Sequence, residues 1–132
     1  CRLVRTMVAQ PDYFTVYLVT ATNPLKTGLR EKLTVASKAT GVDKHHIITC
    51  NDKHLLIGDI MIDDYTKNID DTLCPECWLI DRPWNKDYDK CSDFIYADEP
   101  VGIWWKRCAE NYIKEHTPSY RLLNKTILRI VI

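Results

Sequence analysis

Short apolar segments separated by turn and helix signals constrain the fold of this chain more than any other feature. They are rich in β-branched and aromatic residues and span residues 15–20, 46–50, 59–63, 77–81, 93–97 and 126–132. Strands that are apolar along their whole length are buried on both faces, which is typical of parallel sheets. The sequence therefore predicts an α/β protein, a three-layer sandwich in which helices cover both faces of a mainly parallel central sheet.

The predicted helices lie between these strands. Asn23 is a suitable cap, Pro24 is a suitable first helical residue, and apolar residues then recur at helical spacing until Gly41. We therefore expect one amphipathic helix over residues 24–40. The segment 101–116 has a similar spacing of apolar residues, which predicts a second helix.

Composition bounds the class of protein. The 132 residues suffice for a single domain, which we assign to residues 1–132, and the 18 basic and 18 acidic residues give no net charge. This balance argues against polymeric nucleic acid as a partner, and no apolar run approaches the ~20 residues of a membrane helix. The first residues lack the apolar core of a signal peptide, so we expect the six cysteines to be reduced thiols in a cytoplasmic protein.

Polar residues that suit a phosphate and a metal follow three of the predicted strands. Parallel strands place their carboxyl ends on one edge of the sheet, where α/β proteins bind ligands. A hydroxyl and an ammonium group suit a phosphate, and adjacent carboxylates suit a hard cation such as Mg²⁺. Each residue alone is also typical of a turn, a solvated surface or a helix cap, so their order and spacing favour a site. The polar residues are Thr20, Thr22, Lys53, Asp63 and Asp64, and Ala21 lies between the two threonines.

This order of motifs resembles the haloacid dehalogenase (HAD) superfamily of phosphohydrolases. The segment "VYLVTAT" is similar to motif two, and "IITCNDKHLLIGDIMIDD" is similar to motifs three and four. The continuation "IDDYTKNI…CWLIDRPWNKDYD" resembles the 5'(3')-deoxyribonucleotidase group of bacteria and phages, including its turn at Pro83-Trp84-Asn85. The resemblance covers residues 14–98.

The resemblance implies a Rossmann-like fold, dependence on Mg²⁺, and hydrolysis of a phosphomonoester through an aspartyl-phosphate. The substrate it implies is a small molecule, a (deoxy)nucleoside monophosphate. Thr20 and Lys53 are then the expected catalytic residues. The expected phosphate-binding residues are Thr20, Ala21, Thr22 and Lys53, and the expected metal ligands are Asp63 and Asp64.

The first motif of the superfamily is not found ahead of Thr20. In that motif a strand ends in Asp-x-Asp and supplies the nucleophile, which this chemistry requires. Asp87-Tyr88-Asp89 has the spacing, but no apolar strand leads into it. Three explanations stay open: the chain is the carboxyl-terminal part of a longer enzyme, it is an inactive member that binds a ligand or partner, or the domain is rearranged and residues 126–132 replace the missing strand.

Cysteines and tryptophans offer further candidate sites. Cys74 and Cys77 form a C-x-x-C pair, which supplies either two zinc ligands or two ordinary thiols. Ordinary thiols are favoured because no second pair has the usual spacing, and redox chemistry is disfavoured because the pair leads into a strand. Trp84 is expected to shape the loop near the site, with stacking on a base as its alternative. Trp104 and Trp105 are expected to pack mainly in the core.

Overall fold

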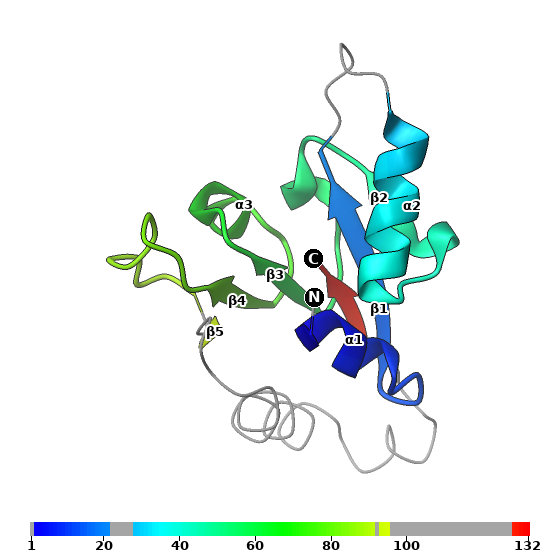
Figure 1. Ribbon diagram of the computed structural model, residues 1–132. Helices are drawn as coiled ribbons and strands as arrows, with labels where there is room; N and C mark the ends of the chain where they lie inside the picture. Colours follow the sequence, from blue (N-terminus) through cyan, green and yellow to red (C-terminus); the bar gives the residue numbers. More distant parts are fainter. Residues whose placement is uncertain (1, 22–27, 92, 96–127) are drawn as a thin grey trace.

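The central sheet is parallel throughout the part of the chain that the computed structural model describes, residues 2–21, 28–91, 93–95 and 128–132 (Figure 1). Its six strands lie in the order β2-β1-β6-β3-β4-β5, and every neighbouring pair is parallel. The strands are β1 (Phe14–Thr20), β2 (Ile47–Thr49), β3 (Ile60–Asp63), β4 (Glu76–Ile80), β5 (Asp93–Ile95) and β6 (Leu128–Val131). The predicted α/β class is therefore confirmed.

Helices lie on both faces of this sheet, as the uninterrupted apolar strands predict. The α-helices are α1 (Arg2–Val8), α2 (Leu29–Thr40) and α3 (Thr66–Asp70), and two short 3-10 turns are η1 (Lys44–His46) and η2 (Lys53–Leu55). Met7 of α1 is fully buried in one core cluster together with Ile60 and Ile62 of β3. Ile69 of α3 packs in a second cluster with Met61, whose side chain points to the opposite face. The arrangement is a Rossmann-like sandwich.

The strand nearest the end of the sequence, β6, lies in the middle of the sheet. It pairs in parallel with β1 on one side and with β3 on the other (Figure 1). Gly58, just before β3, allows this close approach, because a Cβ there would lie 2.7 Å from Cγ2 of Val131 and 2.8 Å from the carbonyl oxygen of Arg129. Asp59 then binds the same strand, accepting hydrogen bonds from the backbone N–H of Arg129 at 2.7 Å and from its Nε at 3.2 Å.

The predicted helix over residues 24–40 begins later than expected. The structure has α2 start at Leu29, preceded by Gly28 in a left-handed conformation with φ of 104°. A residue in that conformation cannot continue a right-handed helix, and the sequence pattern did not reveal it. The predicted cap at Asn23 and Pro24 lies outside the described residues. The predicted end is confirmed, because Gly41 adopts φ of 79° and its N–H donates to the carbonyl of Ser37 at 2.8 Å.

The other predicted elements are confirmed where the structure describes them. The strand predicted over residues 93–97 is seen as Asp93–Ile95, and the helix predicted over residues 101–116, with Trp104 and Trp105, lies outside the described residues. The short helices α1 and α3 were not predicted, because neither repeats its apolar spacing often enough to be recognised. Within the described residues, no helix has both the length and the apolar character needed to cross a membrane.

Candidate functional site

The carboxyl ends of the parallel strands form one edge of the sheet, and the predicted site residues that the structure describes lie along it. Thr20 is the last residue of β1 and Asp63 is the last residue of β3. Lys53 begins η2, the short turn that follows β2. Parallel pairing thus gathers residues that are far apart in the sequence, as the rule for ligand sites in α/β sheets predicts.

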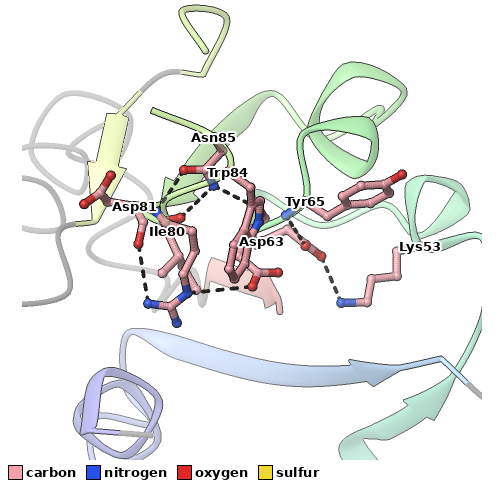
Figure 2. A network of polar contacts seen from close by, with 9 residues as sticks. Lys53, Asp63, Tyr65, Ile80, Asp81, Trp84 and Asn85 are labelled. Atoms are coloured by element: carbon pink, nitrogen blue, oxygen red, sulfur yellow. Dashed lines mark hydrogen bonds and ion pairs between the residues drawn. The ribbon is translucent and has the colours of Figure 1, made fainter. Parts of the chain in front are cut away.

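Asp63 is the most highly connected carboxylate of this edge. It is buried, with 4% of its surface exposed. Its Oδ2 accepts from Nζ of Lys53 at 2.9 Å, and its Oδ1 accepts from the backbone N–H of Tyr65 at 2.9 Å (Figure 2). Its Oδ2 also accepts from Nδ2 of Asn68 at 3.0 Å. A buried carboxylate is tolerated when its charge is paired and its oxygens are hydrogen-bonded. Asp63 therefore fixes the lysine, and both of its oxygens already have donors.

Asp64 differs from its neighbour in being open to solvent. Its side chain is 44% exposed, and Nε of Arg82 lies 3.8 Å from its Oδ2, which is an ion pair longer than a hydrogen bond. A carboxylate in this position can exchange its partner for a ligand at little cost. Of the two predicted metal ligands, Asp64 is the one available to a cation.

A buried side-chain amide attaches the loop after β4 to this strand end. Asn85 is 3% exposed, and its Nδ2 donates to the carbonyl oxygens of Asp64 and Ile80, each at 2.9 Å. Its Oδ1 accepts from the backbone N–H of Arg82 at 2.9 Å (Figure 2). One side chain thus joins the carboxyl ends of β3 and β4 to the loop that carries Arg82 and Trp84.

Trp84 is held beside Asp64 with its ring exposed. Its Nε1 donates to the carbonyl oxygen of Asp64 at 3.2 Å, and 66% of the residue is accessible to solvent. Tyr65, the residue after Asp64, is also 55% exposed. This hydrogen bond agrees with the expectation that Trp84 shapes the loop. The exposed indole leaves open the alternative that Trp84 stacks on a base.

Thr20 and Ala21 lie at the end of β1 on the same edge. The carbonyl oxygen of Thr20 accepts from the backbone N–H of Cys50 at 3.1 Å, which aligns the ends of β1 and β2. The carbonyl oxygen of Ala21 accepts from Nζ of Lys32 on α2 at 2.8 Å. Thr22 lies outside the described residues. Because β6 separates β1 from β3, Thr20 and Asp63 lie on opposite sides of the end of β6, roughly two strand spacings of ~4.8 Å apart.

The register of β6 shows which residue position lies between Thr20 and Asp63. Ile60 is level with Ile130 and Met61 with Val131, so the position that directly follows Ile132 is level with Asp63. Pairing with β1 continues to the same point, because the N–H of Ile132 donates to the carbonyl of Tyr17 at 3.0 Å. A group attached at this position would lie between the strand ends that carry Thr20 and Asp63.

Carboxylate oxygens, such as those of Asp63 and Asp64, are the type of ligand that Mg²⁺ prefers, but the described residues of this edge offer few of them. The described part of the chain contains no group of three or more His, Cys, Asp or Glu side chains that could hold a metal. Mg²⁺ usually keeps several waters and is bound by one or two carboxylates together with substrate phosphate oxygens. Asp64 could provide such a carboxylate, whereas Asp63 is buried and already accepts three hydrogen bonds.

The C-x-x-C pair provides no zinc site among the described residues. Cys74 is buried, and its sulfur accepts from the N–H of Gly58 at 3.2 Å and donates to the carbonyl of Leu56 at 3.6 Å. The thiol of Cys77 donates to the carbonyl of Cys74 at 3.7 Å, and burial raises the pKa of Cys77 to about 11. A raised pKa disfavours the thiolate that metal binding and redox chemistry require. Cys74 is part of a buried core cluster, and Cys77 packs against the same cluster.

The sequence missed three residues of the site, namely Asn68, Arg82 and Asn85. Asn68 and Asn85 lie inside the segments that resemble the nucleotidase group, and this was the one signal that could have found them. Asp87 and Asp89, which have Asp-x-Asp spacing, are exposed. The hydroxyl of Tyr88 between them donates to Asp70 on α3 at 3.1 Å. They follow no strand, in agreement with their exclusion as a nucleophile motif.

A comparison with known protein families found a match that covers more than half of the chain. The model of the protein family described as 5' nucleotidase, deoxy (pyrimidine), cytosolic type C, matches residues 4–98. This range includes most of α1 and all of strands β1 to β5, with Lys53, Asp63 and Asn85, and it leaves β6 outside. No curated protein matches the chain.

Proposed function

Because the chain belongs to the 5' nucleotidase, deoxy (pyrimidine), cytosolic type C family of the HAD superfamily, we propose that it binds and hydrolyses the phosphomonoester of a (deoxy)nucleoside monophosphate with Mg²⁺. Membership makes it a nucleotidase-like phosphohydrolase in general terms. The substrate, the metal and the residue roles are our proposal. We also expect it to act in the cytoplasm, because the matching family is of a cytosolic type.

The observation that carries the proposal is the ion pair between Lys53 and Asp63 at the carboxyl edge of the sheet, with Asp64 open beside it. Lys53 would donate to the phosphoryl oxygens and offset their charge, while Asp63 holds its ammonium group in place. Thr20 would donate its hydroxyl from the other side of β6. The backbone of Ala21 and Thr22 would complete the phosphate site.

A metal ion would be held chiefly by Asp64. Bound Mg²⁺ would draw charge from the phosphoryl group and orient it towards the attacking group. Arg82, 3.8 Å from the same carboxylate, would then be displaced towards solvent or substrate. The aspartates thus have separate tasks, since Asp63 positions the lysine and Asp64 is the ligand.

The nucleophile is the part of the proposal that depends on β6. Of the explanations left open by the sequence, the rearranged domain gains support from the central position of β6, between the strands that carry Thr20 and Asp63. An aspartate at the position after Ile132 would be level with Asp63 and could attack a phosphate held by Lys53. We therefore propose that β6 takes the place of the strand that leads into motif one.

A second candidate function is binding without catalysis. It is favoured by one observation, namely that the Asp-x-Asp sequence at Asp87 and Asp89 is exposed and follows no strand. In that case the edge with Lys53 and Asp64 would bind a phosphorylated ligand or a partner and leave it unchanged.

The test compares binding and turnover in two forms of the purified chain. One form ends at Ile132, and the other carries Asp-Xaa-Asp directly after it. Binding of dUMP with Mg²⁺ is measured by calorimetry, and release of inorganic phosphate is measured in parallel. We expect both forms to bind dUMP and the extended form to release phosphate much faster.

Two variants show whether the proposed residues are responsible. Lys53→Ala should weaken dUMP binding at least tenfold, whereas Lys90→Ala, which breaks the exposed pair with Asp70, should leave it unchanged. Binding without turnover in both forms would favour the non-catalytic candidate. Absence of any dUMP binding, or equal binding by the Lys53→Ala variant, would overturn the proposed function.

A further inference from the structure

The high solvent exposure of Trp84 is unusual for so large an apolar side chain. Trp78, on the neighbouring strand β4, is 2% exposed, as expected for an indole in a small domain, whereas Trp84 is 66% exposed. The ring is nevertheless fixed, because its Nε1 donates to the carbonyl oxygen of Asp64. A large apolar surface that is held rigidly in solvent is suited to bind a flat ligand.

The loop that carries this ring is anchored independently of it. Asn85 ties the loop to the ends of β3 and β4 through two hydrogen bonds of 2.9 Å. The backbone of the loop is therefore held at this strand end by Asn85 in addition to the indole N–H of Trp84. The exposed face of Trp84 is left without a structural task among the described residues.

The position of the ring relates it to the phosphate site. Lys53 contacts the side chain of Asp63, and Trp84 contacts the backbone of the next residue, Asp64 (Figure 2). The cation and the aromatic ring are thus anchored to successive residues at one strand end. A nucleotide has this polarity, because its anionic phosphate is joined through a sugar to a flat base that stacks on aromatic rings.

We propose that Trp84 is a specificity-determining residue, whose indole stacks on the base of a nucleoside monophosphate while its phosphate lies at Lys53. This inference rests on the proposed function and adds the group that separates nucleotides from phosphorylated sugars. Tyr65, the residue after Asp64, is also exposed. Stacking of this kind tolerates different bases, since each has an aromatic face.

The test uses three ligands that differ by one part each, namely inorganic phosphate, deoxyribose 5-phosphate and dUMP, all with Mg²⁺. The unaltered chain should bind dUMP on the order of tenfold more tightly than deoxyribose 5-phosphate, the gain expected of one stacked base. Two matched variants separate stacking from the hydrogen bond. Trp84→Phe and Trp84→Leu both lose the donor to Asp64, but only phenylalanine keeps an aromatic face.

We expect Trp84→Phe to retain most of the preference for dUMP, and Trp84→Leu to lose it while binding phosphate as before. Equal affinities for dUMP and deoxyribose 5-phosphate in the unaltered chain would overturn the inference and leave the proposed function standing. Equal behaviour of the two variants would also overturn it, because the ring would then act only through its hydrogen bond or its bulk. Failure of the chain to bind any of the three ligands would instead overturn the proposed function together with this inference.

Discussion

Nζ of Lys53 lies 2.9 Å from Oδ2 of Asp63, and the pair connects the turn after β2 to the end of β3. The lysine side chain is 20% exposed and the aspartate side chain 3% exposed, so the cation lies between solvent and a buried anion. An ammonium group in such a place is held firmly and remains reachable by a ligand. The ion pair between Lys53 and Asp63 is therefore expected both to stabilise the carboxyl edge of the sheet and to prepare Lys53 for the proposed binding of phosphate.

Removal of the lysine should destabilise the fold as well as weaken binding. Lys53→Ala leaves the buried carboxylate of Asp63 with two neutral donors, and we expect a loss of about 2–3 kcal/mol in the free energy of unfolding. Urea denaturation measures this loss. Lys90→Ala removes an ion pair whose lysine is 72% exposed, and it should change stability by less than about 0.5 kcal/mol. Equal losses of unfolding free energy in the two variants would show that the buried ion pair stabilises the fold no more than the exposed one.

The two adjacent aspartates should respond differently to the same substitution. Asp63→Asn should cost about 2–3 kcal/mol, because it leaves the ammonium group of Lys53 without its anion. Asp64→Asn lies at an exposed position and should change stability by less than about 0.5 kcal/mol, while it removes the stabilisation that Mg²⁺ gives. Thermal unfolding with and without Mg²⁺ distinguishes the two. A variant of Asp64 that still responds fully to Mg²⁺ would assign the metal to other ligands.

Asn85 should be more important for stability than its place in a loop suggests. Asn85→Ala removes the amide donor to the carbonyl oxygen of Ile80 and one of the two donors to the carbonyl oxygen of Asp64, which keeps the indole N–H of Trp84, and we expect a loss of about 1–3 kcal/mol in unfolding free energy. Asn85→Asp keeps the shape but has no amide donor, so it should cost a similar amount. Lys86→Ala, at the exposed neighbouring position, is the control. Unfolding in urea that is unchanged by Asn85→Asp would contradict the role of the amide.

Substitution of Gly58 by a residue with a Cβ should destabilise the protein, because β6 packs directly against this position. In Gly58→Ala the new Cβ would lie 2.7 Å from Cγ2 of Val131 and 2.8 Å from a backbone carbonyl, so β6 must shift away from β3. We expect a loss of about 1–3 kcal/mol, together with faster amide hydrogen exchange in β6. The double variant Gly58→Ala, Val131→Ala relieves only the side-chain contact and should not recover full stability. Normal exchange in β6 of the single variant would argue against the close packing of these strands.

Alkaline pH should destabilise the protein through Cys77. Burial, and then the nearby charges of Cys74 and Glu76, raise the pKa of Cys77 from 9.0 to about 11. Between these pH values the unfolded chain loses the thiol proton and the folded chain keeps it, so the unfolded state gains in stability as pH rises. Burial and a hydrogen bond to Asp70 raise the pKa of Tyr88 to about 12, which extends the same trend. The free energy of unfolding should therefore fall from about pH 9 upwards, and less steeply in Cys77→Ala; identical slopes would contradict this assignment.

The sequence by itself determined the class of the fold and most of the edge residues. Continuous apolar strands have to be buried on both faces, so the parallel sheet and its helical layers followed from the pattern alone. Because parallel strands end on one edge, Thr20, Lys53 and Asp63 were predicted to lie along it, and the structure has them there. These conclusions depend on local composition and on a rule of sheet geometry, and both are readable along the chain.

The order of the strands was decided only by the tertiary structure. Residues 126–132 predict a strand, but nothing local says that it inserts between β1 and β3, since that depends on the close approach at Gly58 and the contacts of Asp59 with Arg129. The difference in burial between Asp63 and Asp64 was likewise not predictable, because adjacent residues of one type differ only in what surrounds them. Asn85 joins segments that are 21 residues apart, and such a contact exists only once the strands are paired. The sequence thus determined which side chains reach the carboxyl edge of the sheet. Long-range packing decided which of them are buried in hydrogen bonds within the protein and which are exposed to a ligand.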